Sequence, residues 1–377
     1  MKLGFFLLVG AGLFSLSNTY GEGLTGARFP SLISSLRVSA PLTFCGERVP
    51  IEIRETREGL EKELLLALWD RPQVILWLKR SRRYLPHIER MLREAHVPAD
   101  LKYIAIAESA LRPHVRSRRG AIGFWQFVPY TGLQYGLTIN EHMDERRNLF
   151  ASTQAAIRYL KDLYKATGSW TLAAAAYNMG EVGLKAEILE QETDNFYQLY
   201  LPLETQRFIF RIISAKLILS NPGKYGFDLS EADYYPALEF DRIDLDCLQD
   251  TPIRLIAQAA QTHFKVIKNM NPEVRGHYLA RGSHTILIPK GSAEDFHRRF
   301  QDLLEDWLAS EQERIYIVKK GDNLSSIADR FGVPLAALLI WNRLDLEAPI
   351  YPGDRLIIYR KVLQQTETER VEPEEGE

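Results

Sequence analysis

Apolar residues recur at helical spacing from about Glu55 to Lys224 of this 377-residue chain, and no other feature limits the fold as strongly. A strand half-buried in a sheet would instead alternate apolar and polar residues, and that alternation is absent from this stretch. We therefore predict a mainly α-helical domain over residues 55–226. The positions that follow the helical period include Leu60, Leu64, Ala67, Leu68, Ile75, Leu78, Ile88 and Leu92.

The N-terminal end has a different character. A short positive start is followed by an almost wholly apolar or small segment, Leu3–Leu16, and then by small residues at Thr19 and Gly21. This pattern predicts a secretory signal peptide over residues 1–21. Its apolar run is shorter than the roughly 20 residues that span a bilayer, although an uncleaved anchor stays open as the alternative. No cysteine follows closely, so we expect no lipid attachment. Residues 22–54, rich in Ser, Gly and Pro, are predicted to be an irregular lead-in.

Charge and cysteine content narrow the functional classes. The formal net charge is -2, so the chain has no overall positive field that would attract nucleic acid. No cluster of His and Cys has metal-ligand spacing, and we predict neither a metal nor another cofactor. The two cysteines, Cys45 and Cys247, could form a disulfide in an exported protein or remain separate thiols, and spacing alone leaves both open.

The C-terminal part of the chain contains a repeat. Thr251–Ile288 aligns with Asp322–Tyr359 at an offset of 71 residues, and no gap is needed. The second copy predicts a strand, two short helices and a strand (βααβ) over residues 315–360. The first copy, over residues 244–290, has the same helices and last strand but a weak first strand. Two copies of one compact unit are therefore expected.

Two further segments accompany the repeat. Residues 291–314, between the copies, place large apolar side chains on one face and predict a connecting helix. Residues 361–377 are acidic, carry no apolar period and are predicted to be disordered.

One glutamate stands on an otherwise apolar helix face. Leu101, Ile104, Glu108 and Leu111 share that face of a predicted helix. A buried, unpaired carboxyl group holds its proton to higher pH, which is what a general acid at neutral pH requires. The alternative is that Glu108 pairs with an arginine or lies at the edge of the apolar stripe.

A segment rich in glycine and aromatic residues follows at 116–127. Gly120 and Gly123 allow the backbone to approach a ligand closely, and Gln126 offers both a donor and an acceptor to sugar hydroxyl and acetamido groups. The neighbouring aromatics, Trp125 among them, provide flat apolar surface, or else belong to the core. The arginines before them could attract peptide carboxylates or form a solvated loop.

A third segment, Ser169–Gly183, predicts an alanine-rich helix that ends near Gly180. Tyr177 and Asn178 then lie at the helix end, where polar side chains can face a cleft. The alternative for Tyr177 is that its hydroxyl group is bonded to backbone.

The segments IAESALRP, GAIGFWQFVPYTG and AAAAYNMG, in this order, resemble the catalytic domain of lytic transglycosylases, in particular the membrane-bound lytic murein transglycosylase D type. The resemblance implies a goose-lysozyme-like helical fold for residues 55–226. The copy at 315–360 resembles a LysM module, and the copy at 244–290 a degenerate one. The implied fold class is mainly α, with small α+β (βααβ) modules after the catalytic domain.

The resemblance also implies roles for individual residues. Glu108 matches the catalytic glutamate, and the glycan would be bound by Ser109, Gly123, Trp125, Gln126, Tyr177 and Asn178. Trp125 departs from the family, which has methionine before the glutamine. The implied partner is the glycan strand of peptidoglycan, with peripheral association with the membrane or the cell wall. The implied location is the periplasm or cell envelope.

The implied reaction uses one carboxyl group. Glycosidases usually employ two, but the only nearby acids, in Asn140–Arg147, lie in a polar run that we expect to be exposed. Glu108 would cleave the bond between N-acetylmuramic acid and N-acetylglucosamine and leave a 1,6-anhydro end. The alternatives are a lysozyme-like hydrolase on the same fold and a non-catalytic wall-binding protein. The sequence determines neither the choice between exo and endo cleavage nor the oligomeric state.

Overall fold

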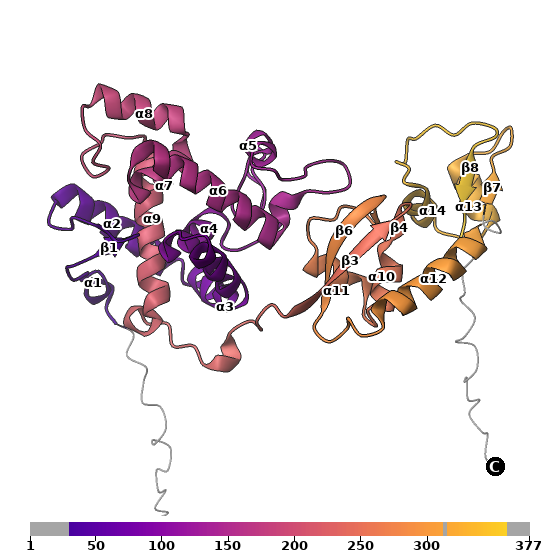
Figure 1. The fold of residues 1–377 in the computed structure, drawn as a ribbon, viewed down its shortest axis with the longest axis horizontal. Helices are drawn as coiled ribbons and strands as arrows, with labels where there is room; N and C mark the ends of the chain where they lie inside the picture. The colour runs from indigo at the N-terminus through magenta and orange to yellow at the C-terminus, as the bar shows by residue number, and fades with distance from the viewer. Residues whose placement is uncertain (1–29, 312–314, 360–377) are drawn as a thin grey trace, which may run out of the picture.

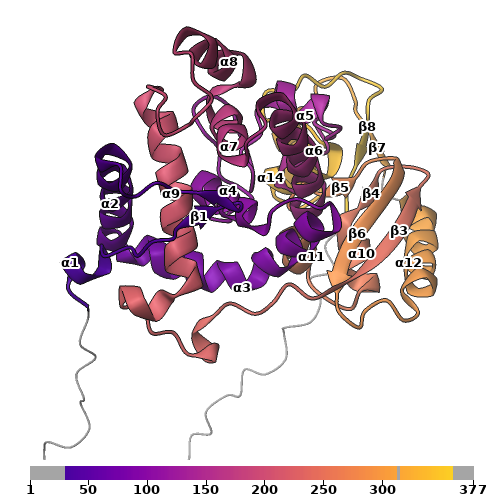
Figure 2. The same cartoon turned by 60° about the vertical axis from the view of Figure 1, so that its left-hand side comes forward.

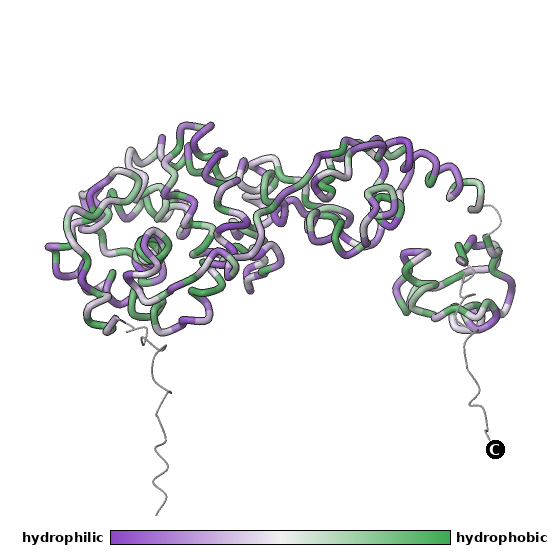
Figure 3. Tube along the Cα trace, turned by 90° about the horizontal axis from the view of Figure 1, so that it is seen from below, coloured by the Kyte–Doolittle hydropathy of each residue, from purple (hydrophilic) through white to green (hydrophobic). Residues whose placement is uncertain are grey.

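A computed structural model describes residues 30–311 and 315–359 of the chain (Figure 1). The predicted signal peptide (1–21) and acidic tail (361–377) lie outside these residues. The buried apolar side chains form three separate clusters, one in the helical N-terminal body and one in each C-terminal unit. Figure 3 shows hydrophobic segments along the trace in each of these three parts. The prediction of a mainly α-helical fold is confirmed.

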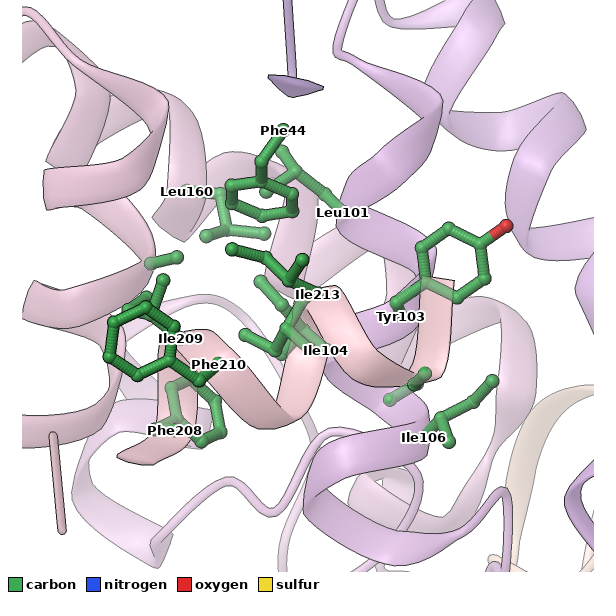
Figure 4. Packing of buried hydrophobic residues seen from close by; sticks show 14 of the residues in the cluster. Phe44, Leu101, Tyr103, Ile104, Ile106, Leu160, Phe208, Ile209, Phe210 and Ile213 are labelled. Atoms are coloured by element: carbon green, nitrogen blue, oxygen red, sulfur yellow. The ribbon is translucent and has the colours of Figure 1, made fainter. Parts of the chain in front are cut away.

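The N-terminal body is built from helices joined by loops and 3-10 turns, with a long loop between α4 and α5. Helix α9 lies at its centre and packs against α2, α4 and α7. Figure 4 shows the large apolar side chains that meet there, from α4, α6, α9 and strand β1. The helices are α1 (Leu32–Ser35), α2 (Arg54–Trp69), α3 (Arg71–Glu94), α4 (Lys102–Ser109), α5 (Pro129–Gln134), α6 (Leu149–Thr167), α7 (Trp170–Met179), α8 (Glu181–Glu190) and α9 (Leu203–Ser220).

The lead-in is more ordered than predicted. Between residues 30 and 54 it forms α1 and a hairpin of β1 (Thr43–Phe44) and β2 (Glu47–Arg48). Phe44 is fully buried in the helical core. The sequence pattern missed the hairpin because two-residue strands carry too little periodicity to detect.

The first C-terminal unit is a two-stranded antiparallel sheet covered by helices. Strand β3 (Phe240–Cys247) pairs with β6 (Gly282–Pro289), and the short strands β4 (Thr251–Pro252) and β5 (Tyr278–Leu279) pair separately. Helices α10 (Ile253–Ala259) and α11 (Phe264–Met270) lie between the strands in the chain. The first strand, expected to be weak, is eight residues long. Helix α12 (Phe296–Glu311), predicted only as a connector, packs Phe296, Phe300 and Trp307 into this unit's core.

The second C-terminal unit repeats the βααβ order with β7 (Ile315–Ile317), α13 (Leu324–Arg330), α14 (Leu335–Asn342) and β8 (Arg355–Ile357). Figure 2 shows both units from a second direction. Among the described residues, no single helix is long and apolar enough to cross a membrane, while the bent pair α13 and α14 passes that test on length and composition only.

An asparagine at the equivalent position of each unit joins a helix to the last strand through side-chain hydrogen bonds. The side-chain amide of Asn271 donates to the carbonyl oxygens of Ile267 and Leu287, and its oxygen accepts from the Leu287 amide. Asn342 makes the same three bonds with Leu338 and Ile357. The bonded strand residue lies 16 positions after Asn271 but 15 after Asn342. The gapless alignment is therefore wrong by one residue at the last strand.

The two cysteines do not pair. Cys45 packs against the core of the helical body, whereas Cys247 belongs to the core of the first C-terminal unit, and both are free. Of the two possibilities that the sequence left open, the structure therefore shows separate thiols and no disulfide.

Candidate active site

Glu108 is held in the last turn of α4 by an apolar face and a sharp helix end. Leu101, Ile104 and Leu111 are fully buried, as the periodicity predicts. The helix stops because Ala110 and Leu111 adopt left-handed backbone angles, with φ of 53° and 59°. Glu108 itself is partly buried, between this apolar floor and the solvent.

Burial raises the pKa of Glu108 from its usual value to about 8, and the charge of Glu204 adds to the rise. The positive charge of Arg211 opposes it but does not cancel it. Arg211 lies 3.6 Å from a carboxylate oxygen of Glu63 and 3.4 Å from one of Glu204. No ion pair with Glu108 forms among the described residues, so the pairing alternative is not observed. At neutral pH the carboxyl group is protonated and can act as an acid.

The loop that carries Gln126 is fixed by its backbone. Gly123 has a φ of 88°, and a Cβ atom there would lie 1.8 Å from the carbonyl oxygen of Arg146. Only glycine fits this position. The side-chain nitrogen of Gln126 donates to the carbonyl oxygens of Val115 (3.1 Å) and Gly123 (2.9 Å). Both donors are thereby used, and the amide oxygen accepts no bond from any described residue. Gln126 thus offers a ligand an acceptor rather than the predicted donor and acceptor.

Two predicted ligand-binding residues are internal supports instead. Ser109 is 2 % exposed, and its hydroxyl group lies 3.0 Å from the Ala105 carbonyl oxygen and 2.8 Å from that of Phe124. Trp125 is fully buried and donates its ring N–H to Thr153 on α6. Neither side chain can touch a ligand in this conformation. The motif alone did not reveal these directions, because the partners Phe124 and Thr153 lie 15 and 28 residues away in the sequence.

Helix α7 brings Tyr177 and Asn178 to the site. Its alanines 173–176 are fully buried and allow close packing, as predicted. The Tyr177 hydroxyl donates to the Trp125 carbonyl oxygen at 2.6 Å, so the backbone-bonded alternative applies. Burial holds the pKa of Tyr177 well above its usual value, and the nearby charge of Glu108 contributes. The Asn178 side-chain oxygen accepts from the Thr205 hydroxyl at 3.0 Å.

The position of α7 depends on a residue that the sequence did not single out. One carboxylate oxygen of Glu47, in the β2 hairpin, accepts from the Ser169 hydroxyl and from the amide and hydroxyl of Thr171. A carboxylate at a helix N-terminus satisfies free amides and interacts favourably with the helix dipole. No local signal could reveal this contact, because Glu47 and Thr171 lie 124 residues apart.

Asp144 contradicts the expectation of an exposed acidic run. It is fully buried and accepts bonds from Arg146 Nε at 2.8 Å and from Arg275 at 3.0 Å. Burial pushes its pKa up, but the hydrogen bonds and charges of the two arginines outweigh burial and leave the pKa below its usual value. Asp144 is therefore ionised and paired, and it cannot serve as a proton donor. Nowhere in the described residues do three or more His, Cys, Asp or Glu gather as a metal site.

Comparison with known families fits this geometry. Residues 86–199, which include Glu108, Gln126 and Tyr177, match the family described as transglycosylase SLT domain. Residues 316–358 match the LysM domain family. These matches confirm the family resemblance that the sequence motifs carry.

Relatives of known name share much of the chain. The membrane-bound lytic murein transglycosylase D proteins of two Escherichia coli strains, K12 and O6:H1, are each 32 % identical to it over 298 residues. The match covers 74 % of this chain and 64 % of each relative. The chain thus spans somewhat less than two thirds of the length of these relatives.

Two solved structures are also similar. An inactive mutant of lytic transglycosylase Slt from Pseudomonas aeruginosa is 18 % identical with a TM-score of 0.31, over 40 % of this chain and 26 % of that one. The 70 kDa soluble lytic transglycosylase of Escherichia coli is 16 % identical with a TM-score of 0.32, over 46 % and 32 %.

Proposed function

We propose that this chain, with its transglycosylase SLT domain at 86–199 and LysM domain at 316–358, is a peptidoglycan lytic transglycosylase. One observation carries the proposal. Glu108, inside the SLT match, has a pKa of about 8 and no ion-pair partner among the described residues. A carboxyl group that is protonated at neutral pH and open to a ligand is the acid that glycosidic cleavage needs.

The reaction proceeds in two steps at this one group. Glu108 first donates its proton to the oxygen that joins N-acetylmuramic acid to N-acetylglucosamine, and the bond from that oxygen to C1 breaks. The resulting carboxylate then accepts the proton of the C6 hydroxyl group while the C6 oxygen bonds to C1. Glu108 regains its proton, the product carries a 1,6-anhydro ring, and no water is consumed.

The neighbouring side chains would hold the sugar. The free amide oxygen of Gln126 suits an acetamido N–H or a hydroxyl donor of the glycan. The Tyr177 oxygen can still accept a bond from the glycan while its hydroxyl group donates to the Trp125 carbonyl oxygen. Asn178 lies beside Tyr177 at the end of α7 and completes this polar edge. Gly123 contributes through its backbone, because the turn that it allows positions the Gln126 side chain.

Product analysis by mass spectrometry on purified sacculi tests the proposal. Wild-type protein is expected to release fragments with 1,6-anhydro ends, and Glu108→Gln to release them roughly 10²–10⁴-fold more slowly. Reducing ends would show a lysozyme-like hydrolase. Sacculus binding that survives removal of residues 55–226, without soluble products from wild type, would show a non-catalytic wall-binding protein.

The parts of the chain divide between cleavage and attachment. We assign cleavage to residues 55–226 and glycan binding to the LysM module at 315–360, with residues 244–290 as a related unit. Both activities require access to the cell wall, so we assign the protein to the cell envelope after export. The LysM match and a relative named as a membrane-bound lytic murein transglycosylase support this location.

A further inference from the structure

The first C-terminal unit is joined to the helical body by backbone hydrogen bonds. After α11 the chain passes along residues 142–144 of the body, and Val274 pairs with Met143 in an antiparallel bridge. The Asp144 amide donates to the Glu273 carbonyl oxygen, and the Arg275 amide donates to the His142 carbonyl oxygen, both at 2.8 Å. Such pairing fixes the register of the two segments and distinguishes this junction from a flexible tether.

Buried side chains reinforce the junction. Glu273 is 3 % exposed, and one of its carboxyl oxygens accepts from the Asn148 side chain at 2.8 Å. Asn148 is also the N-cap of α6, where its oxygen accepts from the amides of Phe150 and Ala151. The first C-terminal unit therefore contacts the residue that starts one of the main helices of the body.

Asp144 is the centre of the junction. Arg146 binds its carboxylate with two nitrogens, at 2.8 and 2.9 Å, and Arg275 adds a third bond at 3.0 Å. Arg275 is the only one of these partners that comes from the C-terminal unit. A buried ion pair is stable only when its geometry is good and its remaining lone pairs are satisfied, so Arg275 supports the Asp144–Arg146 pair.

Arg146 connects this centre to the loop of Gln126. One guanidinium nitrogen donates to the carbonyl oxygens of Gly120 (2.9 Å) and Phe127 (3.2 Å), which lie on either side of the loop. The backbone carbonyl oxygen of Arg146 lies against Gly123. A continuous set of hydrogen bonds thus runs from Arg275 through Asp144 and Arg146 to the loop that aims Gln126 at the ligand.

We infer that residues 240–289 are a structural part of the catalytic unit, and that Arg275 is a positioning residue for the Gln126 loop. This inference rests on the proposed function. It gives the degenerate LysM-like unit a role distinct from wall binding, since its loop at 273–275 is used for docking onto the SLT domain. Its loss lowers the rate of glycan cleavage even on substrates too short to need a binding module.

The test compares Arg275→Ala with Arg275→Lys in the full-length protein, with soluble uncrosslinked glycan strands as substrate. We expect kcat/KM to fall about tenfold in the alanine variant and to recover in part with lysine, which retains the charge. Arg298→Ala on α12 is the matched control, because Arg298 is 70 % exposed and pairs only with Asp295 among the described residues. It should keep full activity.

A double-mutant cycle separates positioning from general structural damage. If Arg275 acts through the loop, Arg275→Ala should cost less than twofold once Gln126→Ala is present. Amide hydrogen exchange at residues 120–127 should also accelerate in Arg275→Ala. Full activity of that variant, or an equal tenfold loss in both backgrounds, would overturn the inference. A wild-type protein that releases no anhydro products would instead reject the proposed function.

Discussion

The hydroxyl group of Tyr177 donates a 2.6 Å hydrogen bond to the carbonyl oxygen of Trp125, the residue immediately before Gln126. The end of α7 and the Gln126 loop are thereby joined next to Glu108, whose charge affects the pKa of Tyr177. Through this bond Tyr177 supports the Gln126 loop, in addition to its proposed contact with the glycan.

Tyr177→Phe is expected to leave the Trp125 carbonyl oxygen without a partner. An unsatisfied buried acceptor costs about 1–3 kcal/mol, and kcat should fall because the loop is no longer tied to α7. Chemical denaturation and steady-state kinetics measure the two effects. Tyr159→Phe is the matched control, since the Tyr159 ring lies 5.3 Å from that of Tyr177. If both variants behave alike, the hydrogen bond is not the cause.

Glu108→Gln is expected to lose activity and gain stability together. A general acid contributes roughly 10²–10⁴-fold to the rate. The folded pKa of Glu108, about 8, exceeds the unfolded value near 4.5. The contribution of this carboxyl group to the free energy of unfolding is greatest below pH 4.5 and is lost as the pH rises through 8. Glutamine never ionises, so it should raise the free energy of unfolding at pH 9 by on the order of 2–4 kcal/mol.

Denaturant titrations at pH 4 and pH 9 measure that gain. The two proteins should be nearly equal at pH 4 and differ at pH 9. A destabilised glutamine variant at pH 9 would contradict the account of Glu108 as a buried, unpaired carboxyl group.

The rate of glycan cleavage should fall at alkaline pH. Because the acid form of Glu108 starts the proposed reaction, kcat/KM should decline about tenfold per unit above pH 8. Measurement of kcat/KM against pH with soluble glycan strands as substrate tests this decline. A rate that stays constant up to pH 10 would exclude a general acid with this pKa.

Gly123→Ala should be far more damaging than Gly120→Ala. Both residues have positive φ, at 88° and 78°, which costs an alanine about 1 kcal/mol. At Gly123 the new Cβ would also collide with the Arg146 carbonyl oxygen, whereas at Gly120 nothing lies within 4 Å. We expect a loss of about 3 kcal/mol or more at Gly123, where the backbone must shift. Equal melting temperatures of the two variants would argue against this close approach.

Removal of residues 315–377 should separate binding from cleavage. The LysM match lies wholly within this segment, while Glu108 and its neighbours do not. Sedimentation with sacculi should weaken more than turnover of short soluble glycans. An equal loss of both would mean that the segment supports the catalytic unit itself.

The sequence predicts well where the physical cause is local. The apolar face that buries Glu108 follows from helical period, and Leu101, Ile104 and Leu111 are buried as expected. The two βααβ units follow from strand and turn patterns over about 45 residues. In each case the residues that decide the structure lie within a few turns of one another.

It fails where the cause is a contact between distant segments. Asp144 is predicted to be exposed in its own polar run, but it is buried, and besides the nearby Arg146 it is bonded by Arg275, 131 residues away. Trp125 and Ser109 resemble ligand contacts by motif, yet their side chains turn inward, where Trp125 bonds Thr153 on α6 and Ser109 bonds the Phe124 carbonyl oxygen. Local patterns carry no information about either effect.

The asparagine shared by the two C-terminal units suggests a way to recognise such units after their surfaces have diverged. Its side chain satisfies three backbone groups at once, and neither aspartate nor leucine could replace all three bonds. Mutations elsewhere can therefore accumulate while this amide is retained. A search for an asparagine at a helix end, with a residue of an apolar strand 15 or 16 positions later, should reveal hidden copies of this fold in other proteins.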